Sequence, residues 1–224
     1  MINYILKRSN RKTTGIYIRN GAVEVRAPHG RPKQEIDHFV QSKAAWITKH
    51  LANQQSQIGR QQAFTLSYGS TISWRGKPYP IIARSCSKAG FDGEVFYMPP
   101  GLNPQQIMAL CIQTYKRLAQ VHFSNRAAYF AEKMGVTPSA IKISNAKTRW
   151  GSCSTGKNIN FSWRLAMACD RVIDYVIVHE LAHLAEMNHS TRFWAIVENI
   201  LPDYQERYVS LNDFSLRLKN ENWG

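Results

Sequence analysis

The sequence predicts an α+β fold in which a β-rich N-terminal part precedes a domain built around a buried helix. Short apolar runs separated by Gly and Pro dominate the first 100 residues, whereas long helical apolar patterns dominate from residue 103 onward. Strands and helices do not alternate, which argues against a doubly wound parallel sheet. The predicted domains are a basic, β-rich region with one helix over residues 1–100 and a helix-rich domain over residues 103–224.

Composition places the chain among ordinary globular proteins. Of its 224 residues, 44% are hydrophobic and 20% are charged, which excludes a disordered chain. No apolar run approaches the ~20 residues that span a bilayer, and the first residues lack the apolar stretch of a signal peptide. Four scattered cysteines without a Cys-x-x-Cys pair predict neither a disulfide framework nor a cysteine zinc site. We therefore expect a soluble cytoplasmic protein without a membrane partner.

The net charge of +14 is unevenly distributed. Residues 1–62 contain 11 Lys and Arg against 3 Asp and Glu, and residues 63–140 contain 8 against 3. Residues 141–224 are nearly balanced, with 10 against 9. Such a surplus attracts nucleic acid, nucleotides or acidic surfaces, so an anionic partner of the N-terminal half is one expectation. A solvated basic surface is the other, because no nucleic-acid-reading motif accompanies the charge.

The first predicted domain consists of a hairpin, a helix and several short strands. Apolar residues alternate over 16–27 around Asn20-Gly21, a dipeptide that adopts positive φ at low cost. Helical apolar spacing predicts a helix from Lys33 to Asn53. Four β-rich runs follow, at residues 64–68, 71–74, 79–83 and 94–98. The loop Pro99-Pro100-Gly101 marks the predicted boundary.

A long capped helix opens the second predicted domain. Asn103 can cap its N-terminus, with Pro104 at the first helical position and Gln106 reaching back to the cap. Gly135 is a typical C-terminal stop.

The rest of the second domain is predicted to be strands and then helices. Residues 140–144 and 158–161 read as strands, with Trp150-Gly151-Ser152 in the turn or strand between them. A helix from about Asp170 to Met187 is apolar on every side, which predicts burial at the centre of the domain. Two further helices are expected over residues 191–200 and 203–218.

The buried helix contains the pattern His179-Glu180-Leu181-Ala182-His183. Histidines at i and i+4 lie on one helical face, so both imidazoles can bind a single cation. Glu180 projects to the side, where it can take a proton from a metal-bound water. Burying two imidazoles and a carboxylate among apolar residues is costly unless a partner such as a divalent metal is present.

A catalytic zinc needs a third protein ligand and leaves its fourth position to water. His189 follows six residues after His183, just beyond the helix, and is favoured because imidazole suits zinc. A carboxylate on the next helix is the alternative, and Glu198 and Asp203 are its candidates. The remaining histidines read as surface residues.

Several segments of the chain resemble the YgjP-like metallopeptidases, a family of metal-dependent hydrolases related to the SprT and WLM zincins. The resemblance is carried by the segments 148–153, 173–183, Asn188-His189-Ser190 and Phe193-Trp194, with weaker N-terminal matches in 25–28 and Trp46-Ile47. It implies a zincin-like catalytic domain with a buried HExxH helix and His189 as third ligand. It does not specify the substrate.

These residues predict a hydrolase that uses one Zn²⁺ per chain, with other divalent metals such as Mn²⁺ or Co²⁺ as alternatives. Glu180 is the expected general base, and zinc lowers the pKa of its bound water toward ~7. Oxyanion stabilisation is assigned to candidates that flank the site, namely Arg149, Arg192 and Tyr175. The segment Trp150-Gly151-Ser152 is a candidate edge strand along which a peptide pairs, and Gly151 permits a close approach.

Three functional classes follow from this sequence. A zinc metallopeptidase that acts on peptide or protein is the first. The second is a metal-dependent nucleotide pyrophosphatase, because metals also activate water against phosphoanhydrides and a basic half attracts polyphosphate. The third is a nucleic-acid-associated protease whose basic half docks on DNA or RNA. No glycine-rich phosphate loop supports the second class.

Overall fold

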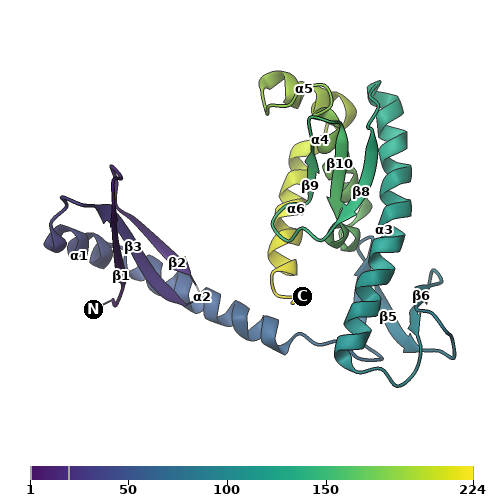
Figure 1. Cartoon of the computed structure of the whole chain (residues 1–224), viewed down its shortest axis with the longest axis horizontal. Helices are drawn as coiled ribbons and strands as arrows, with labels where there is room; N and C mark the ends of the chain where they lie inside the picture. The colour runs from purple at the N-terminus through teal and green to yellow at the C-terminus, as the bar shows by residue number, and fades with distance from the viewer. Residues whose placement is uncertain (1, 20, 224) are drawn as a thin grey trace. The chain divides into compact units, whose positions relative to one another are not determined.

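A computed structural model describes residues 2–19 and 21–223 of the chain and shows a mixed α+β protein (Figure 1). The chain divides into two compact units. Unit 1 runs to Phe64 and includes Lys219–Asn222, whereas unit 2 runs from Thr65 to Leu218 and includes Trp223. No helix in the described part of the chain has the length and apolar content that crossing a bilayer requires.

Unit 1 is a three-stranded sheet covered by helices. Strands β1 (Ile5–Ser9), β2 (Gly15–Arg19) and β3 (Ala22–Pro28) lie in the order β1-β3-β2. Strand β3 pairs parallel with β1 and antiparallel with β2. Helices α1 (Lys33–Ser42) and α2 (Ala44–Ala63) follow. The core joins alternate residues of β3 to one face of the helices and consists of Val23, Val25, Ala27, Ile36, Val40 and Ile47.

The predicted hairpin is confirmed by the pairing of Ile18 with Val23. Gly21 has a φ of 77°, as the turn requires, and Asn20 lies outside the described residues. The prediction of a single helix over Lys33–Asn53 is wrong. At Lys43 the backbone leaves helical geometry, with φ −104° and ψ 12°, and its N–H bonds to the carbonyls of Gln41 and Val40 instead of continuing the ladder. A second helix, α2, then continues to Ala63.

The four strands that follow belong to unit 2, so the compact units divide after Phe64 and not at the expected loop 99–101. Strands β4 (Thr71–Trp74), β5 (Lys77–Ala83), β6 (Gly90–Phe91) and β7 (Phe96–Met98) form one sheet in the order β4-β5-β7-β6.

Within unit 2, this sheet packs against Tyr115 of helix α3 (Pro104–Met134). The Tyr115 hydroxyl donates to the carbonyl of Ser73 at 2.5 Å, and its ring packs 5.4 Å from that of Phe96. The expected strand at residues 64–68 is absent, because the described backbone there pairs with no strand.

Helix α3 confirms the predicted boundaries. The Asn103 side chain accepts from the backbone N–H of Gln106, and the Gln106 side chain accepts from the N–H of Asn103, each at 2.9 Å. Gly135 ends the helix in the left-handed region with φ 63°. The sheet beside it has the order β8-β10-β9 and contains β8 (Ala140–Ser144), β9 (Gly151–Cys153) and β10 (Asn158–Ser162).

Helix α4 (Asp170–Ala182) packs against α3, β9, α5 (Thr191–Ile200) and α6 (Tyr204–Leu218). Nine of its residues are buried. It ends five residues before the expected Met187, because the N–H groups of Leu184 and Ala185 bond three residues back and tighten the chain into turns. The residues after this end therefore form a loop that returns toward the helix.

Candidate metal centre

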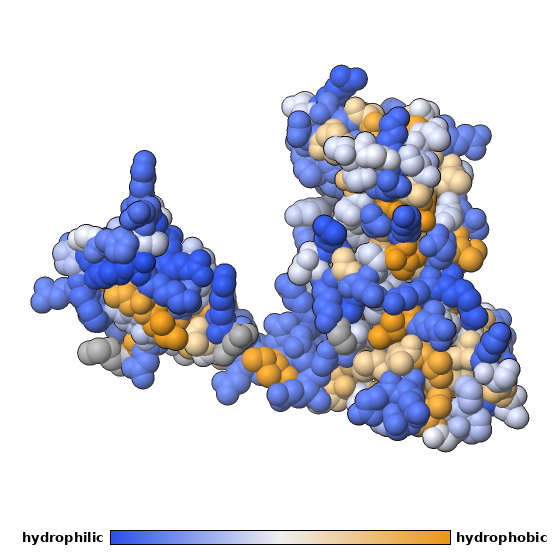
Figure 2. Space-filling view, viewed as in Figure 1, coloured by the Kyte–Doolittle hydropathy of each residue, from blue (hydrophilic) through white to orange (hydrophobic). Residues whose placement is uncertain are grey.

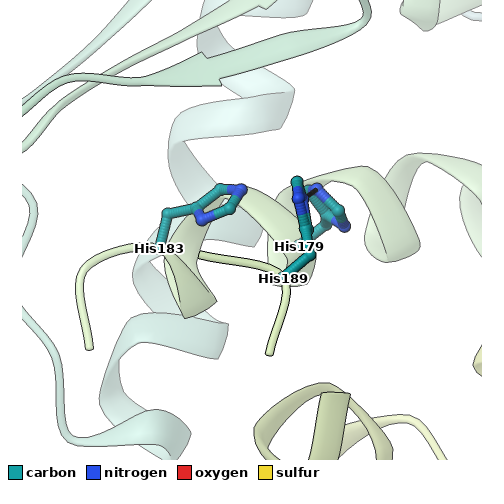
Figure 3. Close-up of side chains that lie close together, drawn as sticks. All are labelled: His179, His183 and His189. Atoms are coloured by element: carbon teal, nitrogen blue, oxygen red, sulfur yellow. Dashed lines mark hydrogen bonds between the residues drawn. The ribbon is translucent and has the colours of Figure 1, made fainter. Parts of the chain in front are cut away.

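Three histidines converge at the C-terminal end of α4 (Figure 3). His179 lies in the last turn of the helix, His183 caps it, and His189 lies in the loop before α5. One ring nitrogen from each lies within 4.8 Å of the other two. The turn after Ala182 brings His189 back to the helix, so that its Nε2 is 3.0 Å from Nε2 of His179.

The lowered pKa values of His179 and His183 favour the neutral imidazoles that bind metal ions. Burial, followed by the neighbouring His183 and His189, lowers the pKa of His179 to about 3. Burial also lowers the pKa of His183. Neutral imidazole is the form that ligates metals, and three histidines make a donor set typical of zinc.

A second contact orients His183. Its Nδ1 lies 3.2 Å from the carbonyl oxygen of Glu186, which can accept only if Nδ1 carries the hydrogen. The Nε2 lone pair is then free for a metal. The residues present therefore fit a divalent cation.

The two alternative ligands lie elsewhere. Neither Glu198 nor Asp203 joins the histidine cluster in the part of the chain that the structure describes. Asp203 instead accepts from Arg207 at 2.7 Å and from Arg171 at 2.7 Å, which occupies its carboxylate. Glu198 is exposed on α5. Of Glu198, Asp203 and His189, only His189 lies with the histidine pair of α4.

Glu180 places a buried carboxyl group beside the cluster. Glu180 is only 6% exposed, and its Oε2 has no hydrogen-bond partner among the described residues. Burial raises the pKa of Glu180 to about 7, and the positive charge of Arg149 opposes this increase. The group is therefore poised to exchange a proton near neutral pH.

Gly151 gives Glu180 the space that it occupies. A Cβ atom built on Gly151 would lie 2.5 Å from both Cγ and Oε1 of Glu180, far inside van der Waals contact. The sequence suggests that this glycine admits a substrate, but the closest approach in the structure is by Glu180. Strand β9 pairs only with β10 among the described strands, so its other edge is open for hydrogen bonding.

Two cavities meet at the histidines. The edge-strand cavity, of about 320 Å³, lies between β9 and the end of α4 and is lined by Gly151, Ser152, Cys153, Glu180, Met187 and the three histidines. The aromatic cavity, of about 680 Å³, shares His179 and His189 with it and is otherwise lined by Tyr175, Trp194, Tyr204, Gln205, Tyr208 and Val209. The cluster thus lies between a cavity bordered by strand β9 and a cavity lined mainly by aromatic residues.

The other predicted site residues do not all lie at the cavities. Tyr175 lines the aromatic cavity, and burial raises the pKa of its hydroxyl to about 12, so it stays protonated. Arg149 is exposed, yet its charge acts on Glu180. The Trp150 indole N–H donates to Oγ of Ser215 at 3.1 Å, which anchors β9 to α6. Arg192 is exposed and lies outside the described lining of both cavities.

Two tyrosines of α6 that line the aromatic cavity are absent from the sequence prediction. Tyr204 and Tyr208 lie one turn apart on α6, a spacing that places two aromatic rings on one helical face. That signal indicates a shared face but not which cavity the face borders.

Comparisons with known proteins bear on this site. The family model of the YgjP-like metallopeptidase domain matches residues 12–214. No curated protein matches the chain. The crystal structure of the metallopeptidase zymogen abylysin of Pyrococcus abyssi matches at 19% identity and a TM-score of 0.39, covering 44% of this chain and 97% of its own. The corresponding jannalysin zymogen of Methanocaldococcus jannaschii matches at 18% identity and a TM-score of 0.37, covering 41% and 94%.

Proposed function

The chain belongs to the family of YgjP-like metallopeptidase domains and is therefore a metal-dependent hydrolase, and we propose that it cleaves peptide bonds with one zinc ion held by His179, His183 and His189. The observation that carries this proposal is the convergence of three imidazoles within 4.8 Å beside the buried carboxyl of Glu180. We also assign unit 2 a zincin-like architecture. Two of its histidines lie at the C-terminal end of the buried helix α4, and the third lies in the loop that returns to this helix.

When bound, zinc supplies Lewis-acid chemistry, because it polarises a substrate carbonyl and makes water a better nucleophile at neutral pH. Glu180 is the general base of the proposed reaction. Its carboxylate oxygen takes a proton from the attacking water and later passes that proton to the nitrogen of the leaving amine. Burial, together with the absence of a competing partner at Oε2 among the described residues, leaves this oxygen available for both transfers.

Strand β9 supplies the proposed binding edge for the substrate backbone. An extended peptide can add to its open side as a further strand, and this places the peptide along the edge-strand cavity. Arg149 and Tyr175 are the residues proposed to stabilise the developing oxyanion. The charge of Arg149 acts at Glu180, and Tyr175 keeps its hydroxyl hydrogen and lines the adjoining cavity.

The linings favour a peptide over a nucleoside triphosphate. Of the described residues that line the two cavities, none is a lysine or an arginine. A triphosphate carries several negative charges and is normally held by such groups. A neutral peptide backbone needs only the hydrogen-bonding edge that β9 provides.

One panel of activity measurements tests the proposed function. Purified protein with one equivalent of zinc is incubated with casein and a mixed peptide library, and separately with the four nucleoside triphosphates. Peptide cleavage is followed by mass spectrometry, and phosphate and pyrophosphate release by colorimetry. We expect cleaved peptides and no phosphate product. Pyrophosphate release without peptide cleavage would overturn the proposal in favour of nucleotide hydrolysis.

A further inference from the structure

The aromatic cavity, at about 680 Å³, is the larger of the two described cavities that the histidine cluster borders. This size lies within the ~300–1,000 Å³ that is typical of ligand sites. Because His179 and His189 line both cavities, a substrate bond positioned at the cluster has the aromatic cavity directly beside it.

Aromatic rings from three helices form the wall of this cavity. Trp194 of α5 lies nearly parallel to the His189 ring, at 5.9 Å and 26°, and to the Tyr204 ring, at 5.4 Å and 20°. Tyr175 of α4 packs edge-on against Tyr208 of α6, with centroids 6.3 Å apart. The wall thus runs without interruption from the candidate metal ligands to the surface.

The outer part of the wall is apolar and uncovered. Tyr208 is 51% exposed and Val209 is 58% exposed. None of the described lining residues is Asp, Glu, Lys or Arg, so a charged side chain that entered here would lose water without gaining an ionic partner. A flat apolar or aromatic group would cover the exposed rings and gain from stacking.

We infer that the aromatic cavity binds a large apolar or aromatic side chain of the substrate, directly beside the hydrolysed bond. This inference rests on the proposed peptidase function and adds to it a preference for certain substrate side chains. The cavity selects Phe, Tyr, Trp or Leu over Ala and over charged residues at one position next to the cleavage site. Tyr208 and Val209 are specificity residues, since they line the cavity but are not part of the histidine cluster.

The test uses full-length zinc-loaded protein and peptides that differ at one position among Phe, Leu, Ala, Asp and Lys within a constant Gly-Ala-Ser sequence. Mass spectrometry locates the cleaved bond, and initial rates give kcat/KM. We expect cleavage adjacent to the variable residue and at least a tenfold preference for Phe over Ala, in line with the roughly 10–200-fold discrimination of apolar pockets.

Two matched variants on α6 connect the preference to this cavity. Val209→Glu adds a carboxylate to the lining, and Leu216→Glu adds one at a residue that is 61% exposed on the same helix and lies outside the described lining. Val209→Glu should reduce the Phe/Ala ratio of kcat/KM at least tenfold and improve the Lys peptide. Leu216→Glu should keep both values.

A binding measurement separates this inference from the proposed function. Fluorescence anisotropy with the zinc-loaded Glu180→Gln protein should show tighter binding of the Phe peptide than of the Ala peptide. Cleavage at rates independent of the variable side chain would overturn the cavity assignment alone. The absence of any peptide cleavage and of any peptide binding would overturn the proposed function, and this inference with it.

Discussion

A methyl group at Gly151 would lie 2.5 Å from Cγ of Glu180, closer than side-chain carbons come to one another. The contact joins the edge strand β9 to the helix that carries the histidine pair. Any side chain at residue 151 must therefore move Glu180, the strand, or both. The position of the proposed general base depends on a residue that has no chemistry of its own.

Gly151→Ala should therefore lower turnover without removing the metal. A displacement of about 1 Å in a reacting group costs on the order of 100-fold in rate, so we expect a decrease in kcat of that size. Gly156→Ala is the matched control, because its nearest contact is 3.3 Å from a side-chain nitrogen of Asn158, which can move. Zinc content measured on both variants should equal that of the unmodified chain. Unchanged kcat in Gly151→Ala would contradict the positioning role.

Replacement of the base itself gives a complementary result. Glu180→Gln keeps the shape of the side chain but cannot accept the proton, so turnover should fall by about 10²–10⁴-fold with the fold and zinc content unchanged. Glu198→Gln on α5 is the control and should retain full activity, because Glu198 is exposed and away from the cluster. If Glu180→Gln keeps activity within about tenfold of the unmodified protein, the base lies elsewhere.

Metal binding should be measurable without any substrate. Zinc that binds only the folded chain at about 100 times its Kd adds about 2.7 kcal/mol of stability, which corresponds to an increase in Tm of about 5–10 °C for a chain of this size. His183→Ala should lose one equivalent of zinc and most of this increase. His38→Ala, at an exposed histidine of unit 1, should keep both. Equal zinc content in the two variants would disprove the three-histidine site.

An acid-sensitive contact links the residue before α6 to α4, because Arg171 of α4 donates to the Asp203 carboxylate at 2.7 Å. Hydrogen bonds from Arg207 and then Arg171 lower the pKa of Asp203 from 3.8 to about 2. Because this pKa is lowered in the folded state, the contact stabilises the protein above about pH 4 and loses that effect as the pH falls toward 2.

Thermal unfolding at two pH values tests this contact. Asp203→Asn should lower Tm at pH 7 by about 2–4 °C, since the carboxylate is partly exposed and its ion pairs are screened by water. At pH 2.5 the gap between Asp203→Asn and the unmodified chain should shrink. The control Asp213→Asn, at an exposed residue of α6 outside these ion pairs, should leave Tm at pH 7 unchanged. A gap that is the same at both pH values would contradict the prediction.

Short sequence motifs predicted the elements whose geometry is determined by residues close to one another in the sequence. The capping box of Asn103 and Gln106 and the stop at Gly135 gave both ends of α3, and Gly21 marked the hairpin turn. The break at Lys43 has no comparable signal, because apolar spacing continues across it and the change of direction follows from packing on β3. For the same reason the parallel pairing of β1 with β3 was not predicted.

The candidate site shows the same division between local and distant information. The histidine pair, Glu180 and His189 lie within eleven residues, so their spacing indicated a metal centre and favoured His189 over Glu198 and Asp203 as its third ligand. The dependence of Glu180 on Gly151 and the aromatic cavity join segments that are distant in sequence, and they emerge only when the sheet and three helices are assembled. The catalytic and ligand roles of these residues stay predictions until the variants above are measured.

The basic charge of unit 1 leads to a last prediction. Within residues 1–62, the acidic residues at 24, 35 and 37 all form ion pairs, which engage Lys7, Arg26, Arg31 and Lys33. Residues 1–62 contain 11 Lys and Arg, so seven lie outside these pairs. If they attract an anionic partner, the full chain should bind a fluorescent oligonucleotide at low salt, and log K should fall linearly with log salt as counterions are released.

Charge reversal should assign that binding to unit 1. A triple variant with Glu at three exposed residues of the unit (Lys12, Arg19 and Lys49) should reduce the salt slope by about 3, because each lost phosphate contact removes about 1. The control carries the same change at three exposed residues of unit 2 (Lys133, Lys142 and Lys147) and should keep the slope. An equal decrease of the salt slope in both variants would show that binding depends on the overall charge of the chain and not on unit 1. No oligonucleotide binding at low salt would leave the basic residues of unit 1 as a solvated surface.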